Sequence, residues 1–283
     1  MSRPTLETLA VSTSDGAGFV LRVTAAESTS APVVLVLPAM AMKAKFYGGL
    51  AKSLHANGLS VATVDLRAQG ESTPPLGEAP DFGYRELVEV DLPAITGALR
   101  DRFPEAPIVL FGHSLGGQLA LLHASVAEDV AAVVVIGTGT VYWKAFGWRR
   151  WAESIGVIQW IGLVARLRGR WPGGVLIPGP MQGGVMTDWA RHSRTGRYRP
   201  RGSEVDYDAR LRELDLPVMV ISLDRDTLGP KSTVDFLCTR IPNARLTRWH
   251  VVEEDGVAHR DHIEWIKDTA VIGGRVAEWV KRG

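Results

Sequence analysis

A seven-residue motif predicts how this chain folds: Phe111-Gly112-His113-Ser114-Leu115-Gly116-Gly117. An apolar run, Pro107–Phe111, leads into the motif, and an apolar helical pattern, Leu115–Ser125, follows it. G-x-S-x-G in this setting is typical of a strand that turns sharply into a helix, because small residues around the serine let strand and helix approach. Such a turn presents Ser114 as a nucleophile near the positive end of the helix. The alternative is a glycine-rich packing turn without chemistry.

The rest of the sequence alternates short apolar runs with longer amphipathic segments, which is typical of a mostly parallel sheet with helices on both faces. Leu6–Thr13 and Phe19–Ala25 flank Asp15-Gly16 and are expected to pair as antiparallel strands at one edge. The other expected strands are Pro32–Leu37, Ser60–Val64, Pro107–Phe111, Val130–Ile136, Pro217–Ser222 and Arg245–Val252. The expected helices are Ala44–Asn57, Tyr84–Arg102, Leu115–Ser125 and Trp265–Lys281. We therefore predict the α/β class.

Composition and charge exclude several kinds of protein. The 283 residues carry 32 Lys and Arg against 31 Asp and Glu, a net charge of +1, so no overall field favours binding to nucleic acid or to an anionic membrane. The longest apolar stretches, Ala31–Met42 and Val130–Ile136, are too short to span a bilayer, and Met1–Gly16 lacks the pattern of a secretory signal. One cysteine, Cys238, excludes a disulfide framework. We expect a cytoplasmic globular protein, and the sequence leaves its number of subunits open.

One segment differs in composition from the rest. Residues 141–205 hold six of the nine tryptophans, and eleven basic residues against three acidic ones give this segment a net charge of +8 while the remainder has −7. Such a shift indicates an inserted subdomain. We predict a core domain of residues 1–140 and 206–283, with residues 141–205 inserted as a lid. The arginines of the insert either pair with acidic groups of the core or form an entrance that attracts anionic substrates or a carrier.

The chain resembles the α/β-hydrolase superfamily over nearly its whole length. Beside Ser114, the loop Asp65-Leu66-Arg67-Ala68-Gln69-Gly70-Glu71-Ser72 is similar to the D-x-R-G-x-G-x-S loop of many members, with Ala68 in place of a glycine. Pro38-Ala39-Met40 resembles the same position in predicted serine hydrolases of bacteria. The resemblance implies an α/β-hydrolase fold with an oxyanion hole of two backbone amides. One would be that of Leu115, and the other that of Met40, with Ala39 as second choice.

The superfamily places its acid and its base after the nucleophile along the chain. The acid follows the strand Pro217–Ser222, and the resemblance favours Asp226 there, with Asp224 as the fallback; either is otherwise an ordinary turn carboxylate. The base follows the last strand. His262, in His262-Ile263-Glu264-Trp265, matches the pattern of related hydrolases better than the fallback His259.

The remaining candidate residues have structural interpretations. His113, His123, His55, His192 and His250 show no metal-ligand spacing with acids or cysteine, so we expect no metal site and no organic cofactor. Cys238 is expected in the core of a helix rather than as a nucleophile.

These residues together predict a serine hydrolase. Ser114, with His262 as general base and Asp226 orienting it, is expected to attack an acyl carbonyl and form an acyl-enzyme. Tryptophans under the lid suggest an apolar pocket, so the first choice of substrate is a carboxylic ester with an apolar acyl part. One alternative is cleavage or transfer of a thioester of coenzyme A or of an acidic carrier protein. The other is a non-catalytic ligand-binding protein on a hydrolase scaffold.

Overall fold

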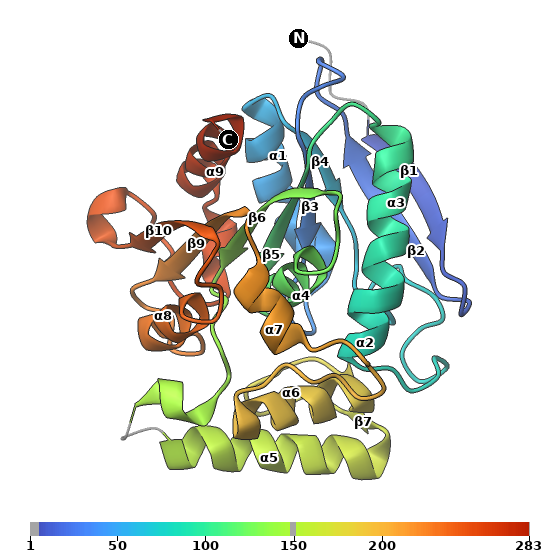
Figure 1. Cartoon of the computed structure of the whole chain (residues 1–283), viewed down its shortest axis with the longest axis vertical. Helices are drawn as coiled ribbons and strands as arrows, with labels where there is room; N and C mark the ends of the chain where they lie inside the picture. The colour runs from blue at the N-terminus through green and yellow to red at the C-terminus, as the bar shows by residue number, and fades with distance from the viewer. Residues whose placement is uncertain (1–5, 148–150, 283) are drawn as a thin grey trace.

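An eight-stranded, mostly parallel sheet forms the centre of the computed structural model, which describes residues 6–147 and 151–282 (Figure 1). Its strand order is β1-β2-β4-β3-β5-β6-β9-β10, and β2 alone runs against both of its neighbours. The strands are β1 (Leu6–Ser12), β2 (Gly18–Thr24), β3 (Val33–Leu37), β4 (Ser60–Thr63), β5 (Ile108–His113), β6 (Val130–Ile136), β9 (Pro217–Leu223) and β10 (Arg245–Val251). The predicted fold class and the antiparallel edge pair are confirmed.

Helices cover both faces of this sheet, as alternate residues of its inner strands show. Val34 and Val36 of β3 pack into one core cluster with α1 (Gly48–Ala56) and α9 (Ala270–Arg282). Leu35 of the same strand packs into the other cluster, with α3 (Leu92–Arg102), α4 (Leu115–Ala124) and α8 (Lys231–Cys238). A strand that is apolar on both faces is stable only between two such layers.

Three of the expected helices differ from the prediction, one in its interior and two at their start. The segment Tyr84–Arg102 contains a short α2 (Tyr84–Glu86), a π turn (Leu87–Asp91) and then α3. Pro93 at the start of α3 lacks the N–H that a regular helix would use there. The last helix begins later than expected, because a 3-10 turn (Glu264–Lys267) first buries Trp265 completely. The predicted start of that helix was therefore wrong. In the segment Ala44–Asn57, the first turn (Ala44–Tyr47) is likewise 3-10 rather than α.

The loop after β4 ties the sheet to its neighbours. Asp65 accepts hydrogen bonds from the backbone N–H groups of Ala44 and Glu71, at 2.7 and 2.9 Å. The buried Arg67 guanidinium pairs with Asp15 and Asp91. Ala68 has a φ of 59°, a left-handed conformation in which glycine costs less, which explains the glycine at this position in similar loops. The loop therefore serves as a scaffold.

Residues 141–205 contribute a layer at one end of the molecule (Figure 1). The layer contains α5 (Trp151–Arg168), the small pair β7 (Arg170–Trp171) and β8 (Met181–Gln182), and α6 (Gly183–Thr195). The helices α5 and α6 pack closely, since a Cβ at Gly162 would lie 2.5 Å from that of Ala190. A 3-10 turn (Trp143–Phe146) leads into this layer, and α7 (Tyr207–Glu213) leads back to the core. A further 3-10 turn spans Glu253–Asp255. Across the described part of the chain, no helix combines the length and apolarity needed to cross a membrane.

Candidate active site

Ser114 occupies a strained turn where β5 ends and α4 begins. Its φ of 53° is a left-handed conformation that costs a non-glycine residue free energy, and such strain concentrates at functional sites. The flanking residues Gly112 and Gly116 must be glycine, because neither position has room for a side chain. A Cβ at Gly112 would lie 2.3 Å from the Cα of Gly117, and one at Gly116 would lie 2.3 Å from the carbonyl oxygen of Leu37. The turn therefore holds the Ser114 hydroxyl at the carboxyl end of the parallel strands.

Three side chains from distant parts of the sequence meet at this turn. The Nε2 atom of His262 lies 3.0 Å from Ser114 Oγ, and its Nδ1 atom lies 2.7 Å from Asp226 Oδ2. The other oxygen of Asp226 accepts the backbone N–H groups of Leu228 and Gly229, at 2.9 and 2.7 Å. A carboxylate oxygen accepts hydrogen bonds, so this geometry suits the tautomer of His262 that carries its proton on Nδ1, in which Nε2 can accept from the Ser114 hydroxyl.

The fallback residues of the sequence analysis lie outside this chain of hydrogen bonds. Asp224 accepts a hydrogen bond from Arg260 Nε at 2.9 Å. His259 is exposed over 41% of its side chain, and its Nδ1 lies 3.6 Å from Glu264. The structure thus brings Asp226 and His262 to Ser114 and leaves Asp224 and His259 apart.

The two residues that the resemblance favoured for the oxyanion hole, Leu115 and Met40, lie on separate segments beside Ser114. Leu115 is the first residue of α4, so its N–H has no acceptor within the helix, and Met40 lies on the loop after β3. Both residues line a cavity together with Ser114. The N–H of Ala39, by contrast, donates to the hydroxyl of Tyr47 at 2.9 Å. Ala39, the second choice for the oxyanion hole, is therefore already engaged.

Tyr47 is a residue of this site that the sequence analysis missed. Its hydroxyl lies 2.7 Å from His113 Nδ1, while the indole N–H of Trp265 donates to His113 Nε2 at 3.4 Å. Burial lowers the pKa of His113 well below its usual value, so the ring is neutral. The network joins the loop after β3, the turn at Ser114 and the segment that carries His262. No spacing in the sequence indicates it, because Tyr47 looks like an ordinary core residue of a helix.

An apolar cavity of about 260 Å³ lies over Ser114 and His262. Residues of the insert line it, among them Val157, Ile158, Leu176 and Trp189. The polar groups of its wall include Gln118, whose amide is engaged with Tyr84 and with the carbonyl of Gly139.

The tryptophans of the insert play different parts around this cavity. Trp189 lines it, as expected, whereas Trp171 is buried within the insert and donates to the carbonyl of Ile177. Trp160 is 50% exposed and contacts the ring of Trp171 edge-on. Trp148 and the side chain of Trp151 lie outside the described residues. Aliphatic side chains therefore make most of the wall that tryptophans were expected to form.

Comparisons with known proteins concern the family and the fold of the chain. The family model described as serine aminopeptidase, S33, matches residues 28–194. No curated protein matches the sequence.

Several solved structures of hydrolases superimpose on almost the whole chain. The Pyrococcus furiosus esterase Pf2001 is 19% identical, with a TM-score of 0.61 over 99% of this chain and 93% of that one. The α/β-hydrolase GrgF from Penicillium sp. sh18 is 16% identical, with a TM-score of 0.66 over 98% of each chain. Est1E from Butyrivibrio proteoclasticus, solved with ferulic acid bound, is 13% identical, with a TM-score of 0.63 over 97% of this chain and 96% of that one. At these identities the likeness concerns the fold.

Proposed function

This chain belongs to the serine aminopeptidase S33 family of α/β-hydrolases, and on that premise we propose that it is a serine hydrolase that cleaves a carboxylic ester with an apolar acyl part. One observation carries the proposal. The hydrogen-bonded series Ser114 Oγ, His262 Nε2, His262 Nδ1 and Asp226 Oδ2 ends inside an apolar cavity. A hydroxyl next to a bare imidazole nitrogen that a carboxylate orients is the arrangement that activates a serine.

The reaction follows from the positions of these atoms. As Ser114 Oγ attacks the acyl carbonyl, His262 Nε2 takes the hydroxyl proton, and Asp226 stabilises the imidazolium that results. The bond to the alcohol then breaks, and His262 returns the proton to the leaving oxygen. Water repeats the sequence on the acyl-enzyme, which releases the acid and restores the Ser114 hydroxyl.

The amides of Met40 and Leu115 are proposed to stabilise the tetrahedral intermediate. Both are backbone donors, so neither depends on a side-chain rearrangement when the carbonyl oxygen becomes negative. A single donor of this kind contributes about 3–4 kcal/mol in enzymes where one has been removed. The N-terminal end of α4 adds a favourable dipole at the same point. The hydroxyl of Tyr47, by holding the N–H of Ala39, positions the loop that carries Met40.

The cavity wall favours an uncharged acyl group over the α-amino group of a peptide. Its aliphatic and thioether side chains, among them Met40, Val157, Ile158 and Leu176, would contact an acyl chain. An ammonium group placed among them would lose its hydration without gaining a counter-charge. The cavity volume of about 260 Å³ lies just below the usual range for small-molecule sites, which suits a short or medium acyl part. Residues 141–205 are proposed to act as the lid that supplies one wall.

A substrate screen tests this proposal. Purified protein is assayed on p-nitrophenyl esters of increasing acyl length and on thioesters, lactones and aminoacyl amides, with Ser114→Ala as control. We expect turnover of short or medium esters without any carrier, greater than that of the amides, and loss of turnover in the variant. Turnover that survives in a folded Ser114→Ala protein would contradict the proposal. A ligand that binds both proteins equally, with no turnover in either, would instead indicate a binding protein.

A further inference from the structure

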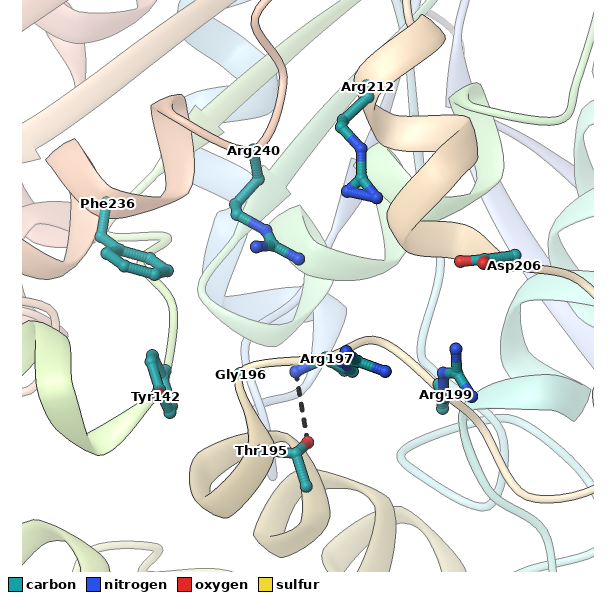
Figure 2. A pocket seen from close by; sticks show the side chains of 9 residues that line it. All are labelled: Tyr142, Thr195, Gly196, Arg197, Arg199, Asp206, Arg212, Phe236 and Arg240. Carbon is teal, nitrogen blue, oxygen red and sulfur yellow. Dashed lines mark hydrogen bonds between the residues drawn. The ribbon is translucent and has the colours of Figure 1, made fainter.

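A second cavity, of about 370 Å³, lies where the insert meets the core (Figure 2). Four arginines from three separate segments line it, and two aromatic rings close one side. The lining includes Arg197, Arg199, Arg212, Arg240, Tyr142 and Phe236, and we call this cavity the arginine pocket.

Local sequence explains why two of the arginines face the same way. Gly196 ends α6 in a left-handed conformation, with a φ of 68°, and turns the chain sharply. The next four residues alternate between exposed and buried: Arg197 and Arg199 are exposed, while Tyr198 and Pro200 are buried. Because side chains of extended backbone alternate in direction, both guanidinium groups lie on the pocket side.

A buried carboxylate fixes the other side of the pocket. Asp208 of α7 is only 6% exposed, and its Oδ1 accepts both Arg240 Nη2, at 2.8 Å, and the backbone N–H of Tyr198, at 3.3 Å. This one group therefore holds Arg240 and the segment between Arg197 and Arg199 in place. The pocket is organised before any ligand arrives, which lowers the entropy cost of binding.

The arginine pocket carries more positive charge than its own residues neutralise. Arg240 has Asp208 as partner, but within the described part of the chain the structure gives no carboxylate partner to Arg197, Arg199 or Arg212. Asp206 lies at the rim, where its carboxylate accepts the N–H of Ala209 and caps α7 (Figure 2). Like charges gathered around one hollow repel one another, and a bound anion removes that repulsion.

Three arginines of the insert illustrate the two interpretations of the sequence. Arg201 pairs with Asp81 of the core, its Nη2 lying 2.5 Å from the carboxylate. Arg197 and Arg199 instead open onto the arginine pocket. Arg149 and Arg150 lie outside the described residues.

Two features suggest that the anion belongs to a larger molecule. The rings of Tyr142 and Phe236 lie 5.6 Å apart at one side of the arginine pocket and offer an apolar contact surface beside the charges (Figure 2). The active-site cavity is also close along the chain, because Val141 lines that cavity while the next residue, Tyr142, lines the arginine pocket.

We propose that the arginine pocket binds the phosphate groups of an organic di- or polyphosphate, whose organic part contacts Tyr142 and Phe236. Guanidinium groups bind phosphate oxygens through paired, charge-assisted hydrogen bonds, and several of them match a group of two or more charges. Two kinds of molecule carry phosphate groups of this kind to the pocket. One is the nucleotide part of a coenzyme A thioester that serves as substrate, which rests on the proposed hydrolase function. The other is a free nucleotide that acts as an effector.

Calorimetric titration of the full chain at physiological ionic strength tests the site, with ADP, coenzyme A and pyrophosphate as probes. The test variant is Arg197→Ala/Arg212→Ala. Its matched control is Arg166→Ala/Arg168→Ala, which removes the same charge from exposed positions of α5 outside the pocket. We expect ADP and coenzyme A to bind, roughly tenfold or more weakly in the test variant, and within twofold of wild type in the control. Failure of all three probes to bind, or equal weakening in both variants, would overturn the proposal.

Two further measurements distinguish the sources. If the pocket holds the substrate, the test variant raises the KM for an acyl-coenzyme A and leaves kcat/KM for a p-nitrophenyl ester unchanged. If it holds an effector, ADP alters ester hydrolysis by wild type but not by the test variant. The Ser114→Ala protein should bind ADP as wild type does, so a failure of catalysis at Ser114 is separable from a failure of this site.

Discussion

Replacing Asp226 by Asn should abolish most activity while leaving the fold intact. The carboxylate has two tasks: Oδ1 accepts the N–H groups of Leu228 and Gly229, and Oδ2 accepts Nδ1–H of His262. An asparagine oxygen can keep only the first. Its NH2 group then faces His262 and donates to Nδ1, which moves the imidazole proton to Nε2. In that tautomer His262 can no longer accept the proton of Ser114.

The expected loss follows from this wrong tautomer. A change of the same kind lowers kcat by about 10⁴ in a serine protease, which corresponds to about 5.5 kcal/mol of activation free energy. We expect a loss of between about 10³ and 10⁴ in kcat for the best ester of the screen, measured under saturating substrate, with little change in KM. Thermal unfolding of the variant should stay close to that of wild type, because the two main-chain hydrogen bonds to Oδ1 persist.

Asp224 provides a matched control two residues away. Its carboxylate pairs with Arg260 and lies outside the series that leads to Ser114. Asp224→Asn should therefore retain activity within about threefold of wild type. Asp226→Asn protein that is folded and keeps more than a tenth of wild-type kcat, or an equal loss in both variants, would refute the reasoning.

Three more outcomes are expected. His262→Gln should lose about 10³-fold or more in kcat, whereas His259→Gln should stay within twofold; the reverse order would assign the base to the other histidine. Gly116→Ala should lower the free energy of unfolding, measured by chemical denaturation, by several kcal/mol, because its Cβ would lie 2.3 Å from a β3 carbonyl oxygen. Gly97→Ala is the control, since Gly97 lies in the interior of α3 with free space around it. This second change should raise the free energy of unfolding by about 0.5–1 kcal/mol. Burial lowers the pKa of His123 to about 4, so the unfolded state binds a proton at higher pH than the folded state does, and stability falls as pH drops below 6.5. His123→Gln should therefore reduce the loss in unfolding free energy between pH 7 and 5 by about 2 kcal/mol. An unchanged loss would count against a buried neutral ring.

Features that depend on local sequence were predictable. The strands could be predicted, because their apolar runs must be buried between two helical layers whatever the details of packing. The turn at Ser114 could be predicted as well, because Gly112 and Gly116 leave room for the close approach of strand and helix that a side chain would prevent. The later start of the last helix was not predictable from periodicity, since the burial of Trp265 overrides the helical pattern before Ala270.

Features assembled from distant segments were not predictable. The contact of Tyr47 with Ala39 and His113 depends on how the helix after β3 lies against the sheet. The arginine pocket joins residues from the end of α6, from α7 and from the turn after α8, which only the folded chain brings together. The sequence indicated an excess of arginine in the insert without indicating where it gathers. The choice of Asp226 and His262 came from a resemblance to related hydrolases, and the folded chain adds the distances from His262 to Ser114 and to Asp226.

Labelling with an organophosphonate tests most directly whether Ser114 is the activated nucleophile. Intact-mass measurement of the folded wild-type protein should show one phosphonyl adduct per chain, and peptide mapping should place it on Ser114. The Ser114→Ala and His262→Gln proteins, equally folded, should remain unlabelled over the same time. A folded wild-type protein that stays unlabelled, or an adduct that maps to another residue, would contradict the account.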